Sequence, residues 1–275
     1  MSEDRAVSVI VLRSSSSGNS TLIWNSKHAI LVDCGLGPRV TEGLLATHGF
    51  SIRDLSGVLV THAHNDHGKR TTIERLFRHE IPVYCLPGVK KVMAEGLSDK
   101  HKPKFRTFSK ASFSIESFRV TSFHVDHDAP GGCVGFCIYS GVGGNTKKIS
   151  LVTDYGGPGE RIAESLLDSH LILIASNYCS KMIEGASPVP EYIKRRHILP
   201  FQPSNDNCSD VLLHVARSSA RLPEAVYLLH ISKNHNTVDK AVDHSKDVLH
   251  AVGYGKIRVL PTYRDASSEV VHLKE

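Results

Sequence analysis

The sequence predicts a mixed α/β protein in which strands and helices alternate along the chain. Five short apolar runs bounded by turn residues are typical of buried strands. Amphipathic helical patterns separate several of these runs, and no linker rich in proline, glycine or serine divides the 275 residues. Alternation of this kind is typical of α/β folds, and a chain of this length can bury a large core. We therefore expect one domain over residues 1–275.

The five apolar runs, taken in chain order, each lead into an aspartate or a histidine. They end at Asp33, His62, His127, Asp154 and His230, following the segments "AILV", "GVLV", "FRVTSFHV", "ISLV" and "AVYLL". Side chains at strand ends on one edge of a sheet can converge on a common site. The repetition therefore predicts one cluster of titratable groups.

Helical patterns account for most of the sequence between the strands. The segments that carry these patterns are "RTTIERLFRHE", "PGVKKVMAEGL", "GERIAESLLDSH", "CSDVLLHVARSSA" and "TVDKAVDHSKDVLHAVGYG". We expect Ser209 and Thr237 to be the N-caps of the last two helices, because a side-chain oxygen there can accept a backbone N–H of the first turn. Near the start of the chain, Gly18 and Asn19 between two apolar runs predict a hairpin turn. The same loop could instead bring its hydroxyl and amide groups to a substrate phosphate.

The composition is ordinary for a soluble globular protein, with 40% hydrophobic and 22% charged residues. No stretch approaches the roughly 20 apolar residues of a membrane span. The start of the chain, "MSEDRAVSVIVL", is acidic and its apolar run is too short for a secretory signal. Six scattered cysteines without a Cys-x-x-Cys pair do not predict a disulfide framework. We expect a cytoplasmic protein that does not bind membranes.

The stretch "THAHNDHGKR" at residues 61–70 places four potential metal ligands within six positions: His62, His64, Asp66 and His67. Neutral imidazole and carboxylate suit zinc and neighbouring divalent metals. Adjacent Asp66 and His67 point in different directions from the His62 and His64 pair, so one ion cannot easily bind all four. We expect two divalent ions, with zinc preferred over manganese or iron. The strand-end residues available to complete the two sites are His127, Asp154 and His230.

These residues resemble the motif of the metallo-β-lactamase fold, and the resemblance covers nearly the whole chain. Within that fold the sequence is similar to the YycJ/WalJ-type branch, whose members are associated with exonuclease action on DNA. The segments that carry the similarity are "SSSSGNSTLI", "ILVDCGLG", "VTHAHNDH", "HDAP", "LVTDYG", "SNYCSKMIEG", "IKRR" and "LLHISKNHN". The resemblance implies an αββα four-layer sandwich of two facing mixed sheets with helices outside, and metals at one edge of the sheets.

The resemblance also implies a role for each site residue. It makes His62, His64 and His127 ligands of a first metal. It makes Asp66, His67 and His230 ligands of a second metal, with Asp154 as the bridge. Asp66 would also be catalytic, and Asp33 would orient the histidine loop from behind the ligands. The residues expected to contact substrate are Ser17, Asn19, Lys69 and Arg70.

Three segments depart from the pattern of that branch. Tyr178 and Cys179 follow Asn177 where the branch has Asn-His-Asp, and Gln202 stands in place of the histidine of Gly-His-Leu-Ser-Asn. His235 stands where the branch has asparagine. The predicted ligands are unaffected, but a histidine that could serve the leaving group is missing. His235 is the nearest titratable candidate by sequence, and we predict it as the catalytic acid.

Our leading interpretation is a two-metal hydrolase of phosphodiester bonds in nucleic acid, and specifically a DNA exonuclease. Two divalent ions can lower the pKa of a bridging water, and the resulting hydroxide then serves as the nucleophile. The net charge of +5 permits an anionic partner. Basic clusters at residues 69–78, 90–91, 100–104 and 194–197 would suit a phosphate backbone.

Two alternatives remain at the level of sequence. The first is a hydrolase of the same fold that acts on a small molecule such as a cyclic nucleotide, a lactone or a thioester. The second is a metal-binding but catalytically weak protein that serves as a binding partner. Tyr178 and Gln202 are the residues that favour the second alternative.

Overall fold

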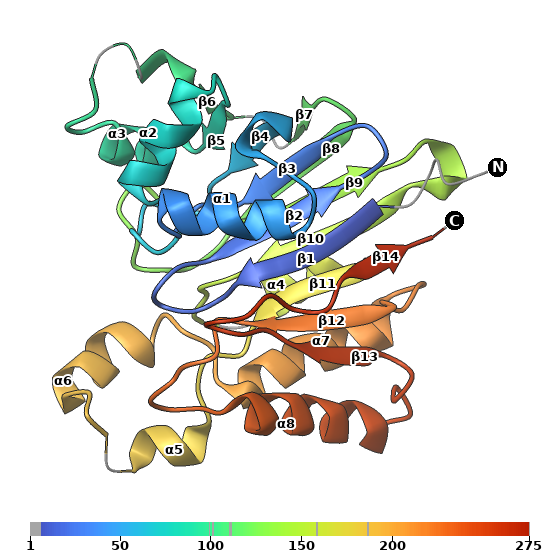
Figure 1. The fold of residues 1–275 in the computed structure, drawn as a ribbon. Helices are drawn as coiled ribbons and strands as arrows, with labels where there is room; N and C mark the ends of the chain where they lie inside the picture. Colours follow the sequence, from blue (N-terminus) through green and yellow to red (C-terminus); the bar gives the residue numbers. More distant parts are fainter. Residues whose placement is uncertain are drawn as a thin grey trace.

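The computed structural model describes residues 7–98, 100, 102–109, 112–157, 159–185 and 187–274. Two seven-stranded sheets pack face to face, and helices cover their outer faces (Figure 1). This arrangement confirms the predicted αββα sandwich. His101, which belongs to the basic cluster at 100–104, lies outside the described residues.

The first sheet is built mainly from the N-terminal part of the chain. Its strand order is β14-β1-β2-β3-β4-β5-β6, with β14 from the C-terminus at one edge. The strands β1 to β3 form antiparallel pairs, and β3 to β6 run parallel. The bounds are β1 (Val7–Arg13), β2 (Ser20–Trp24), β3 (Ala29–Val32), β4 (Leu55–Leu59), β5 (Val83–Cys85), β6 (Phe105–Thr107) and β14 (Val271–Leu273).

The second sheet follows in sequence and has the order β13-β12-β11-β10-β9-β8-β7. The strands β7 to β10 are antiparallel, and β10 to β13 are parallel. The bounds are β7 (Ser112–Ile115), β8 (Phe118–His124), β9 (Val134–Ser140), β10 (Lys147–Val152), β11 (Leu171–Ala175), β12 (Ala225–Leu229) and β13 (Arg258–Pro261). Strands β11 and β12 are buried along their whole length, as parallel strands covered on both faces must be.

Helices α1 to α3 cover the first sheet, and α4, α7 and α8 cover the second (Figure 1). The α-helices are α1 (Pro38–Thr47), α2 (Arg70–Arg78), α3 (Pro87–Met93), α4 (Glu160–Leu166), α5 (Ser180–Glu184), α6 (Glu191–Ile193), α7 (Asn205–Ser218) and α8 (Val238–Ala251). Short 3₁₀ turns are η1 (Ile52–Asp54), η2 (Lys102–Lys104) and η3 (Gly143–Asn145), and η4 (Lys194–Ile198) is a π-helix. No helix in the described part of the chain is long and apolar enough to cross a membrane.

The structure confirms one of the two predicted helix caps and corrects the other. Thr237 caps α8, and its hydroxyl accepts the Lys240 N–H. The prediction that Ser209 begins α7 is wrong, because this helix starts four residues earlier. Ser204 is the cap: its hydroxyl accepts the N–H of Asn207, whose side chain accepts the Ser204 N–H in return. Ser209 is instead buried inside the helix against Ser245.

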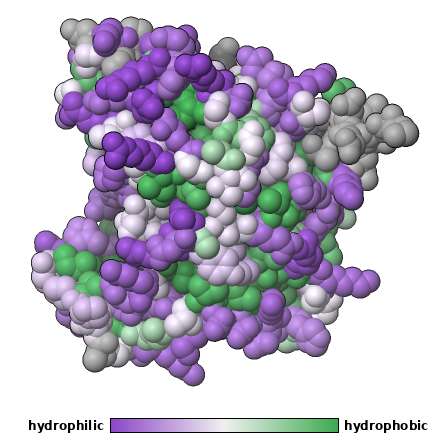
Figure 2. All heavy atoms as spheres, viewed as in Figure 1, coloured by the Kyte–Doolittle hydropathy of each residue, from purple (hydrophilic) through white to green (hydrophobic). Residues whose placement is uncertain are grey.

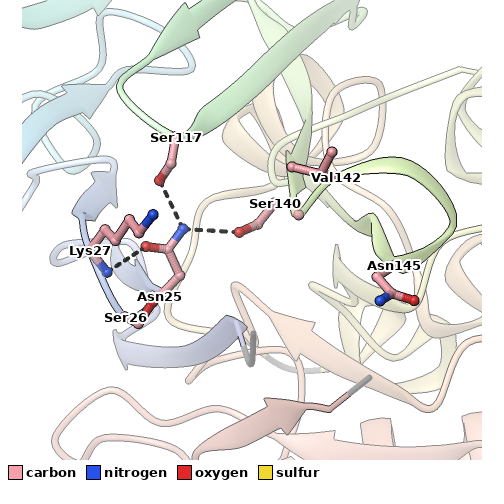
Figure 3. A pocket seen from close by; sticks show the side chains of 8 residues that line it. Asn25, Ser26, Lys27, Ser117, Ser140, Val142 and Asn145 are labelled. Carbon is pink, nitrogen blue, oxygen red and sulfur yellow. Dashed lines mark hydrogen bonds between the residues drawn. The ribbon is translucent and has the colours of Figure 1, made fainter. Parts of the chain in front are cut away.

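The end of the sandwich opposite to the predicted cluster is closed by three turns. The Asn25 amide, between β2 and β3, donates to the hydroxyls of Ser117 at 2.9 Å and Ser140 at 3.0 Å (Figure 3). These bonds tie the first sheet to the second. A cavity of about 470 Å³ opens beside them, and Lys27 and Val142 are among its lining residues. Its lining, as far as the structure describes it, includes none of the predicted site residues.

One buried hydroxyl links the two sheets through the middle of the sandwich. Tyr227 in β12 is fully buried in the inner core, and its hydroxyl lies 3.2 Å from the carbonyl oxygen of Val9 in β1 and 2.6 Å from that of Glu269. It therefore donates from the second sheet to the backbone of the first sheet and of the segment that leads into β14.

We predict that Tyr227→Phe destabilises the protein, because it removes the buried hydroxyl that donates to the carbonyl oxygens of Val9 and Glu269. The expected loss in the free energy of unfolding is about 1–2 kcal/mol. Urea denaturation of the parent and the variant would measure it. Tyr192→Phe is the matched control, because Tyr192 is 64% exposed and should lose nothing. Equal stability of the two variants would contradict the role of the Tyr227 hydroxyl.

Candidate metal centre

The two sheets bring all five predicted strand ends to one edge of the sandwich. Strands β3 and β4 run parallel, as do β10 to β12, so their carboxyl ends meet there. Asp33 follows β3 of the first sheet, and Asp154 and His230 follow β10 and β12 of the second. Titratable groups from both sheets thus lie at this edge. Strand β8 ends at His124, three residues before His127, and contributes through the loop that follows. The predicted convergence is therefore observed.

The histidine loop between β4 and α2 is held by backbone contacts with the loop after β3. Cys34 donates its N–H to the carbonyl of His67 at 2.7 Å, and Lys69 donates to the carbonyl of Cys34 at 3.1 Å. Gly35 packs directly on this loop: a Cβ atom there would lie 1.7 Å from the carbonyl oxygen of Asp66. Only glycine allows this approach. The chain thereby fixes the positions of Asp66 and His67.

Three histidines form the first group of potential ligands. Suitable ligand atoms of His62, His64 and His127 all lie within 4.8 Å of one another. The Nδ1 atom of His64 is 3.2 Å from Nε2 of His127, and the ring centre of His62 is 4.8 Å from each of the other two rings. The structure thus brings together the set predicted for the first metal.

The second group comprises Asp66, His67 and His230, whose ligand atoms also lie within 4.8 Å of one another. Oδ2 of Asp66 is 3.5 Å from Nε2 of His67 and 3.4 Å from Nε2 of His230. The two imidazole rings are stacked, with an interplanar angle of 12°. This is the set predicted for the second metal.

Asp154 lies between the two groups. Its Oδ2 is 3.0 Å from Nε2 of His67, and its Oδ1 is 3.5 Å from Nε2 of His230. Together with His62 and His67 it also forms a third possible ligand triad. A buried carboxylate that contacts the second group and lies within 4.8 Å of His62 of the first group is placed as a bridging ligand would be.

Two buried polar atoms at the centre of the cluster indicate what is needed there. Nε2 of His62 and Oδ2 of Asp154 have no partner in hydrogen-bonding geometry among the described residues, although the Asp154 atom lies 3.0 Å from Nε2 of His67. A buried polar atom left in this way costs about 1–3 kcal/mol, so such atoms in native sites require a reason. Both atoms are typical ligand atoms for a divalent cation, and a bound cation would satisfy them. The donor set therefore fits a metal.

The electrostatics of the cluster also suit cations. Burial and the neighbouring His67 hold the pKa of His62 well below its ordinary value, so this ring is neutral and able to coordinate. Burial alone would lower the pKa of His67, but Asp33 and Asp154 outweigh it and raise that pKa well above its ordinary value. The carboxylates thus attract positive charge to the site.

Asp33 lies behind the second group. Its Oδ2 is 2.7 Å from Nδ1 of His67, and its Oδ1 accepts the backbone N–H of Thr61 at 2.9 Å. The Thr61 hydroxyl also donates to this carboxylate. These contacts support the prediction that Asp33 orients the histidine loop. The sequence analysis missed Thr61, which directly precedes the motif.

His230 is positioned by two further residues that the sequence analysis did not assign to the site. Its backbone N–H donates to the Ser14 hydroxyl at 2.8 Å. The amide nitrogen of Asn177 donates to the His230 carbonyl at 2.8 Å and lies 2.9 Å from Nδ1 of the His230 ring.

Asp33 and His230 have positive φ angles, of 62° and 54° respectively. Non-glycine residues rarely adopt this conformation, and here it occurs where strand ends deliver side chains to the site.

The four residues predicted to contact substrate lie in different surroundings. Asn19 is buried, and its amide lies 3.0 Å from Nε2 of His67 and 3.4 Å from Oδ2 of Asp66. Ser17 is exposed and accepts a bond from Arg264. The guanidinium of Arg70 contacts Glu74 at 3.1 Å and the carbonyl of Gly96, and Lys69 directly precedes α2. Their role in substrate binding stays a prediction.

The sequence of residues 28–231 matches the family model described as a beta-lactamase superfamily domain. The match covers most of the chain and includes every predicted metal ligand. The chain belongs to this superfamily. The predicted metallo-β-lactamase fold and the prediction of a metal-dependent hydrolase are thereby confirmed.

Within the beta-lactamase superfamily the chain is similar to proteins of the YycJ/WalJ type, as the sequence motifs predicted. It is 28% identical over 257 residues to "Exodeoxyribonuclease YycJ" of Bacillus anthracis, covering 89% of this chain and 90% of the relative. It is also 28% identical over 241 residues to "Exodeoxyribonuclease WalJ" of Streptococcus pneumoniae, covering 84% of each. The metallo-β-lactamase fold protein YhfI of Bacillus subtilis shares the fold with a TM-score of 0.71 at 13% identity, covering 98% of this chain and 100% of YhfI.

Gln202, a departure from the YycJ/WalJ pattern, lies at the metal centre. Its Nε2 donates to Oδ1 of Asp154, and its own Oε1 is buried without a hydrogen-bond partner among the described residues. The preceding residue, Phe201, places its carbonyl oxygen 3.2 Å from Nδ1 of His127. The segment that carries Gln202 therefore touches one predicted ligand of the first group and the predicted bridge.

His235, the predicted catalytic acid, lies elsewhere. It is buried, and its Nε2 is 2.5 Å from the hydroxyl of Ser187. Burial and the charge of Lys194 lower its pKa. The groups of potential ligands found among the described residues do not include it. Its assignment as the acid stays a prediction. The contact with Ser187 places its ring beside the segment that follows α5.

We predict that the protein binds two divalent ions per chain, and that Asp154→Ala loses more metal than His64→Ala. Asp154 is the predicted bridge and shares possible ligand triads with members of both groups, whereas His64 belongs to one group, so His64→Ala should keep about one ion. Mass spectrometry of purified, folded protein would count the ions. Asp128→Ala is the control, because this carboxylate is exposed and pairs with His197. One ion or none in the folded parent would contradict the prediction.

Proposed function

We propose that this protein is a two-metal phosphodiesterase that hydrolyses DNA from its ends. The observation that carries the proposal is the position of Asp154, which contacts His67 and His230 of the second group and has a ligand atom within 4.8 Å of one of His62 in the first group. Two ions bridged by one carboxylate are a recurring arrangement in enzymes that cleave phosphodiester bonds. Five imidazoles and two carboxylates make zinc the metal that we propose.

The relatives support a nucleic-acid substrate. Two of them carry the name exodeoxyribonuclease, and each aligns with more than four-fifths of this chain. The choice of DNA and of end-directed cleavage is therefore our proposal.

The residues around the centre have separable tasks in this reaction. Divalent ions bound here would supply Lewis acidity, which acidifies water and stabilises charge on phosphate oxygens. Asp33 holds the His67 ring in one orientation through Nδ1, which leaves Nε2 directed at Asp66 and Asp154. Asn177 and Ser14 fix His230 in the same way. Side chains held this rigidly keep the reacting groups in the orientation that the reaction requires.

Positive charge near the site would help to bind a phosphate backbone. The exposed Arg195 and Arg196 lie on η4, the π-helix that leads towards Gln202. Figure 2 shows an indentation on the left of the molecule, between α1–α3 and α5–α6 of Figure 1. Hydrophilic side chains lie on both sides of this indentation. A strand of DNA could enter there and approach the edge where the ligands lie.

The departure at Gln202 from the YycJ/WalJ pattern bears on how the leaving group departs. A positioned acid typically contributes about 10²–10⁴-fold in rate. Gln202 can donate a hydrogen bond but cannot release a proton near neutral pH. We propose that Gln202 instead orients Asp154, to which its amide donates, and that cleavage relies on the metals to stabilise the departing oxygen.

We predict metal-dependent hydrolysis of labelled DNA ends, and we expect His67→Ala to abolish turnover while retaining much of the affinity for DNA. The reason is that His67 belongs to the centre and is fully buried, whereas phosphate contacts come from the surface. His214→Ala, a substitution on α7 beside Glu164, is the control and should keep activity. Denaturing gels would follow the cleavage and fluorescence anisotropy the binding.

The affinity for DNA should also fall as salt rises, because bound phosphates displace counterions. Two phosphate contacts alone would give about a tenfold loss between roughly 50 and 200 mM salt. If the inactive variant binds DNA no better than an unrelated acidic protein does, the nucleic-acid assignment is wrong. Turnover of a small phosphodiester without turnover of DNA would favour a small-molecule substrate.

We predict that Gln202→His raises the turnover of substrates with poor leaving groups, because a histidine there could donate a proton. Activated aryl phosphodiesters, which need no acid, should change little. The comparison of both substrates at one pH measures the effect, with a gain of about tenfold or more for DNA. Gln202→Glu provides a second titratable group of similar length. If both variants match the parent on both substrates, the missing acid does not limit this enzyme.

A further inference from the structure

Three asparagines from separate parts of the chain form a buried hydrogen-bonded network next to His230. Asn177 lies two residues after β11, Asn205 begins α7, and Asn236 directly precedes Thr237, the cap of α8. The three residues are 7%, 4% and 3% exposed, in that order. Asn177 is the member of the network that contacts His230.

The side chain of Asn236 is at the centre of this network. Its Nδ2 lies 2.8 Å from Oδ1 of Asn205 and 3.1 Å from each of the carbonyl oxygens of Ser176 and Asn177. Its Oδ1 accepts the backbone N–H of Thr237 at 3.0 Å. Every polar group of this buried amide is therefore paired, and a fully paired buried network holds its members in one arrangement.

Asn205 connects the network to the start of α7. Its Oδ1 also accepts the hydroxyl of Ser176 at 2.8 Å, and its backbone N–H donates to the carbonyl of Tyr178 at 2.8 Å. Residues 176–178 are thus held both by the start of α7 and by the residue before the cap of α8. Both helices cover the outer face of the second sheet (Figure 1).

The main chain of Asn177 has no freedom to turn within the network. Its N–H donates to the carbonyl of Pro203 at 2.9 Å. Its own carbonyl accepts the N–H of Ser232 at 2.9 Å as well as the amide of Asn236. A rotation of this residue would break several buried hydrogen bonds at once, and each buried group left unpaired costs about 1–3 kcal/mol.

The side chain of Asn177 carries this constraint to His230. Its amide nitrogen is 2.8 Å from the His230 carbonyl oxygen and 2.9 Å from Nδ1 of the ring. The other ring nitrogen, Nε2, lies 3.4 Å from Oδ2 of Asp66 and 3.5 Å from Oδ1 of Asp154. The orientation of the ring therefore decides where the potential ligand atom lies. Residues that orient a ligating histidine typically change metal affinity about 10–100-fold when they are replaced.

We propose that Asn236 is a positioning residue for the second metal, and that it acts through Asn177 on the ring of His230. The inference rests on the proposed two-metal function and deepens it. The effect is confined to the second group of potential ligands. Within the described part of the chain, the three histidines of the first group make no hydrogen bond to these asparagines.

The test measures metal affinity, so that it does not depend on turnover. The zinc-loaded full chain is titrated with a chromophoric chelator that removes the ions in turn. His230→Ala identifies the removal step that belongs to the second ion. We expect Asn177→Ala to weaken that ion by about 10–100-fold. Asn236→Ala, one residue further from the ligand, should weaken it by about tenfold and leave the other ion as in the parent.

A double variant distinguishes positioning through Asn177 from a general structural role. Residues that act through one another are not additive. Asn177→Ala combined with Asn236→Ala should therefore hold the second ion as tightly as Asn177→Ala alone. Losses that multiply in the double variant would overturn the proposal. Asn205→Ala removes the acceptor of the Asn236 amide and should weaken the same ion, which keeps the test available if Asn236→Ala does not fold.

Asn25→Ala is the matched control, because the Asn25 amide also joins separate segments but does so at the opposite end of the sandwich. It should keep both ions with the affinity of the parent. The proposal fails if Asn236→Ala binds both ions as the parent does, or weakens both alike. It fails equally if Asn25→Ala loses the second ion to the same degree.

Hydrogen exchange of the metal-free proteins separates the proposal from the two-metal function. The N–H of Ser232 is bonded to the carbonyl that Asn236 holds, so it should exchange faster in Asn236→Ala than in the parent. Asn25→Ala should leave it unchanged. A parent that binds fewer than two ions would contradict the proposed function. Faster exchange at Ser232 would then still support the positioning role, and unchanged exchange would overturn it.

Discussion

The fully buried ring of His67, held between two carboxylates, is the constraint on which the rest of the site depends. Asp33 contacts one ring nitrogen at 2.7 Å and Asp154 the other at 3.0 Å. Charges removed from water in this way are stable only when each has a partner. The two aspartates come from different sheets, so the contact requires the sheets to face each other at this edge. Loop conformation, ligand grouping and the choice of residues at the strand ends all follow from that requirement.

The backbone conformation allows the His67 ring to be held between the two aspartates. Asp33 and His230 leave their strands in a left-handed conformation, and Gly35 permits a contact that any side chain would prevent. Strain of this kind persists only where the surroundings determine it, and functional sites are where it concentrates. Thr61, Ser14 and Asn177 then hold the aspartate and the histidine in place. The residues that hold the potential ligands are thus positioned as precisely as the ligands themselves.

Apolar periodicity, strand-end residues and the histidine-rich motif predicted one cluster of seven potential ligands at a sheet edge, because strand direction decides where such residues meet. The αββα sandwich was implied by the resemblance to the metallo-β-lactamase fold. The start of α7 was mispredicted because Ser204 and Ser209 are chemically equivalent caps, and only the reciprocal bond with Asn207 selects the first. The position of His235 beside Ser187 depends on how two distant loops pack. The contact of Gln202 with Asp154 and the network around Asn236 likewise arise from tertiary packing, which leaves no periodic pattern in the chain.

The division of ligands between the sheets has a consequence for how the molecule assembles. His62, His64, Asp66 and His67 follow a strand of the first sheet, while His127, Asp154 and His230 follow strands of the second. Each group of three takes members from both, so neither half of the chain contains a complete site. The centre can form only after contacts distant in sequence have closed, a process that is slow in proteins of high contact order. A complete set of ligands therefore exists only when the two sheets are docked, and a bound cation would stabilise the docked pair.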